Sequence, residues 1–404
     1  MENGSIKEAN MDPTGRWRTW VEILAVSTKL GLTSFGGPIA HLGYFRHEYI
    51  EKRKWLDDRS YADLVALCQF LPGPASSQVG MSIGMLRGGF VGGIVSWFGF
   101  TWPSVLLLVL FAYLFQGLNL ADAGWIMGLK IVAVAVVAQA IFGMGKKLAS
   151  DSRGLTVAVM SAIIMLVWPS ALGQIGVIVA SGIAGLFLYK NPDLPEGAEN
   201  RVIFKKRTGV VAFTLFFVFL IGLPLLRQLW GNGWLLMFDT FYRVGALVFG
   251  GGHVVLPLLQ QEVVPNGWVS EQAFLAGYGA AQAVPGPLFT FAGYLGAMIH
   301  GWTGAIVTTI GIFLSSFFLV IGALTFWGNL RRYRRFQSAL LGINASVVGI
   351  LLAAFYHPVF TSAIRTPMDF ALALAAFAML MYWKLPPWIV VLFGAIAGYL
   401  LSLL

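Results

Sequence analysis

Charged residues are scarce in this chain, and their scarcity settles its broad class. Only 11% of the 404 residues are charged, whereas an average soluble domain carries about 25%. Hydrophobic residues make up 57% of the sequence, and long apolar runs recur from Val91 to the C-terminus. Runs of about 20 such residues cross the core of a bilayer as helices. The composition therefore excludes a soluble globular protein and predicts an all-α polytopic integral membrane protein.

Cysteine is almost absent, and several chemistries are excluded with it. Cys68 is the only cysteine, so neither a disulfide within the chain nor a cysteine-based metal site can form. Histidines and acids do not gather with metal-ligand spacing, and the sequence holds no P-loop, HExxH or GxSxG motif. We therefore expect no metal, no cofactor and no enzymatic activity.

The net charge of +9 could suggest a nucleic-acid partner. The lysines and arginines lie mainly beside the apolar runs, however, as they do in membrane proteins that keep positive charge in the cytoplasm. We therefore expect membrane lipid, and no nucleic acid, as the partner of these charges.

The chain breaks its own helices at two matching places. The tripeptide Pro-Gly-Pro occurs at residues 72–74 and again at residues 285–287, and a glutamine stands three residues before each, Gln69 and Gln282. Proline donates no backbone hydrogen bond and restricts the residue before it, so Pro-Gly-Pro interrupts a helix. At membrane depth, the freed backbone groups need protein or a polar cavity as partners. Two such breaks favour a transport site, and the residues responsible are Pro72, Pro74, Pro285 and Pro287.

The two Pro-Gly-Pro motifs belong to an internal repeat. Sliding the sequence along itself by 213 to 214 residues aligns glycine, proline, tryptophan and polar positions rather than interchangeable aliphatic ones. A duplication explains this pattern better than shared apolar composition does. The matches include Phe35-Gly36-Gly37 with Phe249-Gly250-Gly251, Lys29 with Arg243, Glu48 with Glu262, Arg87 with His300, and Lys130 with Asn344.

The repeat predicts the organisation of the chain. We expect a cytoplasmic N-terminal tail (1–16), a first membrane repeat (17–190), a cytoplasmic linker (191–208), an unpaired transmembrane helix (209–230) and a second repeat (235–404). One unpaired crossing inverts the second repeat relative to the first, which is the inverted-repeat plan of many secondary transporters.

Basic residues test this inversion. In the first half they gather at residues 46–59, at Arg87 and at residues 146–153, whereas in the second half they gather at residues 331–335, which match an uncharged loop. Both basic clusters of the first half lie on the cytoplasmic side only if the segments that contain Phe-Gly-Gly (FGG) and Pro-Gly-Pro (PGP) are re-entrant hairpins. The chain then crosses the membrane nine times, and its C-terminus lies outside the cell. The alternative is thirteen full spans, with residues 46–59 outside.

Broken helices also supply candidate binding groups, because their free N–H groups and positive dipole ends attract anions. Glycine allows close approach of a ligand, although it also allows tight helix packing. The glutamine amides could donate to an oxyanion or satisfy the broken helix. The candidate substrate-binding residues are Lys130, Asn344, Gln69, Gln282, Gly36, Gly37, Gly73, Gly250, Gly251 and Gly286.

Lys130 is an ionisable residue within an apolar segment, which is a functional hypothesis by default. It could instead extend to the interface or pair with Asp122. A second group of residues could line the path or couple protons, but hairpin anchoring, topogenic charge and ordinary structural roles are the alternatives for them. These weaker candidates are Lys29, Arg87, Arg243 and His253.

With these motifs the chain resembles the chromate ion transporter family, specifically its long two-domain members, over about residues 17–404. The resemblance implies a carrier of the inner (cytoplasmic) membrane that exports chromate, confers chromate resistance and is driven by the proton gradient or the membrane potential. Its carrying motifs are Phe35-Gly36-Gly37-Pro38, Trp55-Leu56, Gln69 through Pro74, Phe249 through Gly252, Gly267-Trp268-Val269, Gln282 through Pro287, Gly128-Leu129-Lys130 and Gly342-Ile343-Asn344-Ala345.

Chromate is a tetrahedral dianion shaped like sulfate, so helix ends, amides and one lysine would suit both ions. A carrier for sulfate or another oxyanion and a gated anion channel therefore remain alternatives. An intramembrane chromate reductase is disfavoured, because the sequence contains no flavin, haem or metal motif. Protons as a coupled ion and a homodimer as the assembly also stay open.

Overall fold

The computed structural model describes residues 13–117, 124–190, 204–249, 254–330 and 333–403, and the regular structure in these ranges is helical. The first half contains α1 (Pro13–Thr33), α2 (Gly37–Phe45), the π-helix η1 (Arg46–Lys52), α3 (Asp58–Phe70), α4 (Ala75–Gly117), α5 (Gly124–Leu148), α6 (Ser152–Val167) and α7 (Ala171–Leu188). The unpaired helix is α8 (Lys206–Trp230). The second half contains α9 (Gly233–Leu247), α10 (Val255–Val263), α11 (Glu271–Ala283), η4 (Leu288–Thr290), α12 (Phe291–Leu330), α13 (Arg334–Ala354), η5 (Phe355–Phe360), α14 (Thr361–Ala363), α15 (Pro367–Met381) and α16 (Pro387–Leu401).

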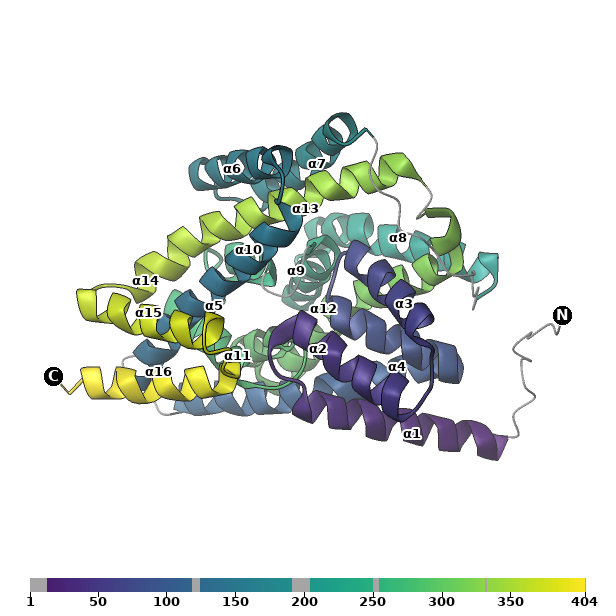
Figure 1. Ribbon diagram of the computed structural model, residues 1–404, viewed down its shortest axis with the longest axis horizontal. Helices are drawn as coiled ribbons and strands as arrows, with labels where there is room; N and C mark the ends of the chain where they lie inside the picture. Colours follow the sequence, from purple (N-terminus) through teal and green to yellow (C-terminus); the bar gives the residue numbers. More distant parts are fainter. Residues whose placement is uncertain (1–12, 118–123, 191–203, 250–253, 331–332, 404) are drawn as a thin grey trace.

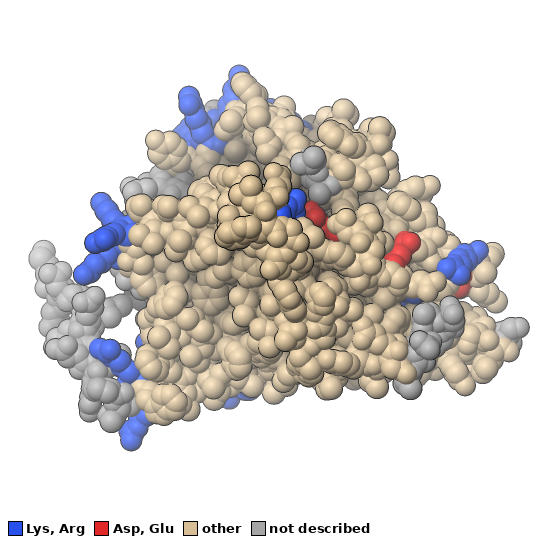
Figure 2. Space-filling view, turned by 180° about the vertical axis from the view of Figure 1, so that it is seen from behind, with Lys and Arg blue, Asp and Glu red and all other residues tan. Residues whose placement is uncertain are grey.

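Five helical stretches among the described residues are long and apolar enough to cross a membrane: 75–117, 124–148, 206–230, 288–326 and 334–363. Most basic side chains on the face seen in Figure 2 lie at its edges, and uncharged residues dominate its broad middle. The predicted all-α polytopic membrane protein is confirmed. Two predicted boundaries shift slightly, because α1 already begins at Pro13 and α8 at Lys206.

The longest helix of each half doubles back on itself. The backbone of α4 reverses at Gly88 and Gly89, and that of α12 reverses at His300 and Gly301, with closely similar torsion angles. The turn of the first half therefore matches that of the second at a spacing of 212 residues. This aligns His300 with Gly88, and the sequence-based match of His300 with Arg87 is wrong by one residue.

Close backbone contact holds the two arms of each doubled helix together. Ser96 Oγ donates to Gly80 O at 2.8 Å between the arms of α4. Thr308 Oγ1 donates to Ala292 O at 2.7 Å between the arms of α12. These bonds join residues at equivalent positions of the two halves, so the duplication extends to side-chain contacts.

The helices on either side of each Pro-Gly-Pro also lie against one another. Cys68 Sγ of α3 lies 3.8 Å from Ser82 Oγ of α4. In the second half, the Tyr294 hydroxyl of α12 donates to Ala273 O of α11 at 2.8 Å. Each chain segment therefore folds back on itself at its Pro-Gly-Pro break.

The two halves are interlocked rather than merely adjacent. Helix α5 of the first half packs against α15 and α16 of the second, while α13 of the second half packs against α6 and α7 of the first (Figure 1). Glycines make these crossings close: a Cβ on Gly128 would overlap the backbone of Gly394, and one on Gly342 would overlap the backbone of Ser181. Small residues allow such contact between helices in membranes. Neither half can complete its own packing alone.

Candidate functional site

Four breaks in the helices define the candidate site. The first FGG break is residues 34–36, the first PGP break is residues 71–74, and the second PGP break is residues 284–287. The second FGG break is residues 248–254, of which 250–253 lie outside the described residues. The predicted site residues Gly250, Gly251 and His253 fall in that undescribed part.

Each PGP break meets the FGG break of the other half. The Gly73 N–H donates to Val248 O at 2.6 Å, and the Gly286 N–H donates to Ser34 O at 2.8 Å. Ser34 and Val248 immediately precede the two Phe-Gly-Gly motifs, at a spacing of 214 residues. The same hydrogen bond therefore occurs twice, once in each direction across the boundary between the halves.

Glycine is required at the middle of both PGP breaks. Gly73 has a φ of 112° and Gly286 a φ of 101°, a region that side chains make costly. Space is also lacking, because a Cβ on Gly73 would overlap Ser316 Oγ and one on Gly286 would overlap Ser104 Oγ. These two glycines allow the backbone of each half to reach the other.

Side chains of the first half add polar contacts around these breaks. Gln78 Nε2 donates to Pro72 O at 2.7 Å and to Ser316 Oγ at 3.3 Å. His41 Nδ1 lies 3.2 Å from Ser76 Oγ. Ser76 and Gln78 are not among the residues predicted for the site, and the signal for them in the sequence is that they follow Pro-Gly-Pro within one helical turn.

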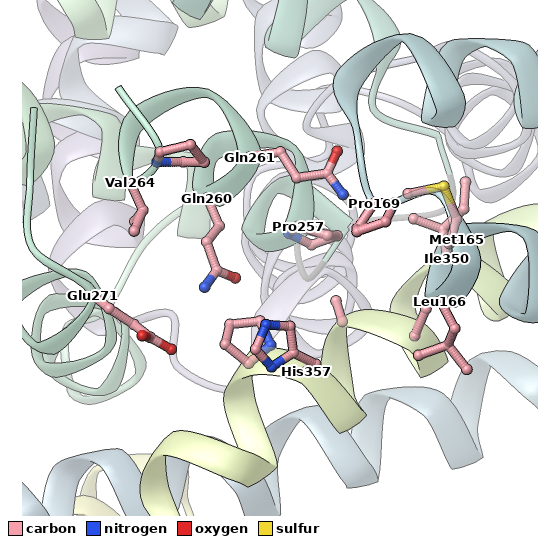
Figure 3. Close-up of a pocket in the computed structure, with 14 residues that line it drawn as sticks. Met165, Leu166, Pro169, Pro257, Gln260, Gln261, Val264, Glu271, Ile350 and His357 are labelled. Atoms are coloured by element: carbon pink, nitrogen blue, oxygen red, sulfur yellow. The ribbon is translucent and has the colours of Figure 1, made fainter. Parts of the chain in front are cut away.

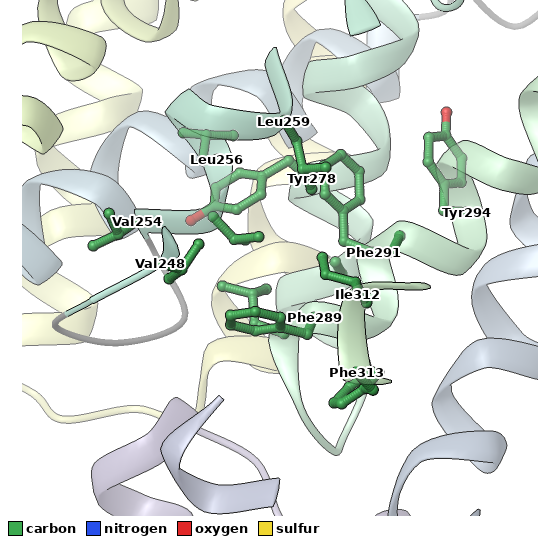
Figure 4. Close-up of a cluster of buried hydrophobic side chains, with 14 of the residues drawn as sticks. Val248, Val254, Leu256, Leu259, Tyr278, Phe289, Phe291, Tyr294, Ile312 and Phe313 are labelled. Carbon is green, nitrogen blue, oxygen red and sulfur yellow. The ribbon is translucent and has the colours of Figure 1, made fainter. Parts of the chain in front are cut away.

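The corresponding part of the second half is apolar. The positions of His41 and Ser76 are taken there by Val255 and Phe289, and both are fully buried. Figure 4 shows the cluster to which this region belongs, with Phe289 and Phe291 packed near Ile312 and Phe313. The repeat is therefore symmetric in its backbone and asymmetric in the chemistry of its breaks.

The two predicted glutamines lie in different surroundings. Gln69 is exposed, whereas Gln282 is half-buried and hydrogen-bonds Tyr278. Gln282 Nε2 is buried without a hydrogen-bond partner among the described residues. Of the two, only Gln282 therefore offers a buried amide donor.

Lys130 and Asn344 lie on equivalent helices that cross into opposite halves. The Lys130 side chain is buried on α5, and the neighbouring Leu129 packs against Gly279 of α11, one turn before Gln282. Asn344 is half-buried on α13, between the glycines that contact α7 and α6. The structure thus brings the lysine, rather than the asparagine, close to the helix that leads into a PGP break.

The matched charges on the helices that flank the FGG breaks form ion pairs. Lys29 Nζ of α1 lies 2.6 Å from Glu48 of η1. Arg53 bridges Glu48 and Glu22 at 3.0 Å each, and Arg87 pairs with Glu22 at 2.9 Å. Lys29 and Arg87 therefore anchor helices of the first half to one another through these ion pairs.

The second half repeats this pair and adds a buried one. Arg243 lies 3.1 Å from Glu262, as Lys29 does from Glu48, and it also pairs with Asp239 at 3.1 Å. Asp239 is fully buried and receives a second arginine, Arg227 of α8, at 2.8 Å. This network fixes the unpaired helix to the second half.

Gly36 and Gly37 lie where α2 begins. Gly36, the N-cap of α2, has a φ of 93°, and Gly37 has a φ of 78°. Both angles favour glycine over any other residue. These two predicted site residues therefore form the sharp turn of the first FGG break.

A pocket of about 260 Å³ lies between the two halves, where Met165, Leu166 and Pro169 of the first half face Gln260, Gln261, Glu271 and His357 of the second. Figure 3 shows Gln260 and His357 extending into the same space from α10 and η5. None of the predicted site residues that the structure describes lines this pocket.

The fold and the site together define a class: a polytopic α-helical membrane protein of two homologous halves whose broken helices meet across their boundary, as in many secondary transporters. A family model described as chromate transporter matches residues 21–186 and 235–399. The chain therefore belongs to the chromate transporter family. This membership supports transport of chromate across a membrane as its general function.

Individual relatives match almost the whole chain. A chromate transport protein of Pseudomonas aeruginosa is 25% identical over 95% of this chain and 92% of its own length. An uncharacterized transporter of Methanocaldococcus jannaschii is 26% identical over 92% of each chain. A chromate transport protein of Cupriavidus metallidurans is 26% identical over 88% of this chain and 86% of its own. No solved structure matches the chain.

Proposed function

We propose that this protein is a secondary transporter of the cytoplasmic membrane that exports chromate and thereby confers chromate resistance. The proton gradient or the membrane potential drives the export. The chain belongs to a family described by this substrate, and its two interlocked halves have the organisation that alternating access requires.

The observation that carries the proposal is the doubled contact between the PGP and FGG breaks. Because Gly73 bonds to Val248 and Gly286 bonds to Ser34, any rocking of one half against the other changes both contacts together. Alternating access in inverted-repeat transporters uses such relative motion around a fixed site. The N–H groups of Gly73 and Gly286 serve this interlock, and other groups bind the anion.

The buried cation in this proposal is Lys130, and Gln282 supplies a neutral donor. An ionisable residue within a membrane helix marks an ion or substrate pathway by default, and a cation at this depth attracts an anionic substrate. Asn344 is its neutral counterpart in the second half. Lys29, Arg87 and Arg243 border the path through their ion-paired hairpins, and the exposed Gln69 contacts the anion outside the buried centre.

The direction follows from electrostatics. A cell that is negative inside favours the exit of anions by about 2.3 kcal/mol per charge for each 100 mV. A dianion gains about twice that amount, so export can proceed with little proton coupling.

The proposal is tested by uptake of radiolabelled chromate into everted membrane vesicles. We expect saturable uptake that sulfate inhibits only at a large excess, and chromate-resistant growth of the cells that express the protein. Stronger inhibition by sulfate than by unlabelled chromate would assign the protein to sulfate instead. A single-channel conductance in electrical recordings would show instead that the protein is a gated anion channel.

A further inference from the structure

Two buried hydroxyl groups beside the helix breaks of the first half lack a hydrogen-bond partner within the described part of the chain. Ser34 Oγ and Ser77 Oγ have no hydrogen-bond partner among the described residues, and the side chains are 0% and 1% exposed. A buried polar group without a partner destabilises the folded state, and such groups are rare in native proteins. Their presence beside the first FGG break and the first PGP break points to a partner that comes from outside the chain.

His41 links the two segments that carry these hydroxyls. Ser77 lies in the first turn of the α4 arm that follows the first PGP break, where residues 75–77 have N–H groups without intrahelical acceptors. Ser34 opens the first FGG break. His41 joins the two, because its ring hydrogen-bonds the backbone of Ser34 and lies 3.2 Å from Ser76 Oγ.

We propose that this first turn of α4, together with the hydroxyls of Ser34 and Ser77, is the oxyanion-binding site of the protein. The inference rests on the proposed function and names the neutral donors of its substrate site. A helix N-terminus attracts anions through its N–H groups and its dipole. Hydroxyl donors bind the oxygens of a tetrahedral oxyanion through charge-assisted hydrogen bonds.

The second half lacks this chemistry. The position of Ser34 is occupied there by Val248, and that of Ser76 by Phe289. The position of Ser77 is Thr290, whose hydroxyl is already bonded to Pro287 O at 2.8 Å. The first half therefore supplies the hydroxyl and helix-end donors of one oxyanion site, and the second half supplies the interlock and the buried amide of Gln282.

The test compares the double variant Ser34→Ala/Ser77→Ala with the control variant Thr290→Ala. Radiolabelled chromate binding is measured by scintillation proximity on the purified full-length protein, with thermal unfolding as a second readout. The double variant should bind chromate about a hundredfold more weakly, because it removes two charge-assisted hydrogen bonds that each contribute about tenfold. Thr290→Ala should bind as the native protein does, with about one chromate per chain.

The unfolding temperatures should move in opposite directions. Removing hydroxyls that lack partners should leave the unfolding temperature unchanged or raise it, whereas removing the bonded Thr290 hydroxyl should lower it. Failure of the double variant to fold would overturn the inference, since it would show that the hydroxyls are structural. Native affinity in the double variant would also overturn it, and would leave the proposed function standing. If the native protein bound neither chromate nor sulfate, both proposals would fail.

Discussion

Gly73→Ala is the substitution that probes the interlock between the halves most sharply. The Gly73 N–H carries one of the two hydrogen bonds between a PGP and an FGG break, at 2.6 Å from Val248 O. A Cβ at this position would overlap Ser316 Oγ and would lie 2.7 Å from Gln78 Nε2. The variant therefore strains the backbone and displaces the side chains that hold the break.

The size of the effect follows from these two contributions. A non-glycine residue in a disfavoured region of positive φ costs about 1–3 kcal/mol. Overpacking a closed contact costs about 1–3 kcal/mol more. The sum predicts a loss of about 2–6 kcal/mol in the free energy of unfolding. Gly286→Ala should behave alike, because it has the same conformation and meets Ser104 in the same way.

Gly267→Ala is the matched control. Gly267 also has a positive φ, of 69°, but nothing lies within 4 Å of a Cβ built there. This variant should show the strain alone, about 1–2 kcal/mol. It should transport chromate at the native rate per molecule, because Gly267 takes no part in the contact between the halves.

The single buried cysteine provides the assay. Cys68 is fully buried, so a thiol-reactive dye reports thermal unfolding without any engineered probe. Gly73→Ala should unfold at a clearly lower temperature than Gly267→Ala and should transport less chromate per molecule. Adding Ser316→Gly should recover the packing part of the loss. Equal unfolding temperatures for Gly73→Ala and Gly267→Ala would refute the reasoning.

Further substitutions test the buried charges. Lys130→Met should abolish transport while the protein still reaches the membrane. Lys147→Met removes an exposed charge from the same helix and should leave transport intact. Normal chromate uptake by vesicles that carry Lys130→Met would show that the lysine is not part of the site. Asp239→Ala should destabilise the protein by about 3–5 kcal/mol in the thiol assay, since it leaves two arginines without their buried partner. Arg227→Ala should cost less, because Arg243 still lies 3.1 Å from Asp239; an equal or larger loss for Arg227→Ala would contradict this order.

Much of the architecture could be predicted from the sequence because duplication leaves marks at residues with special backbone needs. The Pro-Gly-Pro breaks, the unpaired helix and the equivalence of Lys29 with Arg243 all follow from spacing alone. The matching of Glu48 with Glu262 was visible as well. That each glutamate pairs with the basic residue of its own hairpin required the structure, because a repeat shows which positions correspond and not which side chains touch.

The exchange of helices between the halves could not be predicted. An apolar helix in a membrane protein carries no local signal of the surface it will pack against, so α5 and α13 could equally have stayed within their own halves. The one-residue shift at His300 has a local cause, since the chain forms the short 3-10 turn η4 (Leu288–Thr290) where the first half continues directly into α4. Gln69 and Gln282 look alike in sequence, and only tertiary packing separates an exposed amide from a half-buried one.

The asymmetry between the halves is the feature that sequence reasoning undervalued. Nothing in the sequence marks His41 and Ser76 as partners, because they lie on different helices, α2 and α4. Their side chains meet although the two residues are 35 positions apart, His41 in the helix after the FGG break and Ser76 in the helix after the PGP break. Polar residues directly after a Pro-Gly-Pro break were the signal, and the apolar residues at the same place in the second half were the contrast.

The most direct test of the account is chromate flux through the purified protein in proteoliposomes, with the pH gradient and the membrane voltage clamped independently. The account predicts saturable chromate movement toward the positive side, faster at higher voltage, and absent in liposomes that hold the Lys130→Met variant. No flux above that of protein-free liposomes would contradict chromate transport. Equal flux through the native and Lys130→Met proteins would contradict the proposed site.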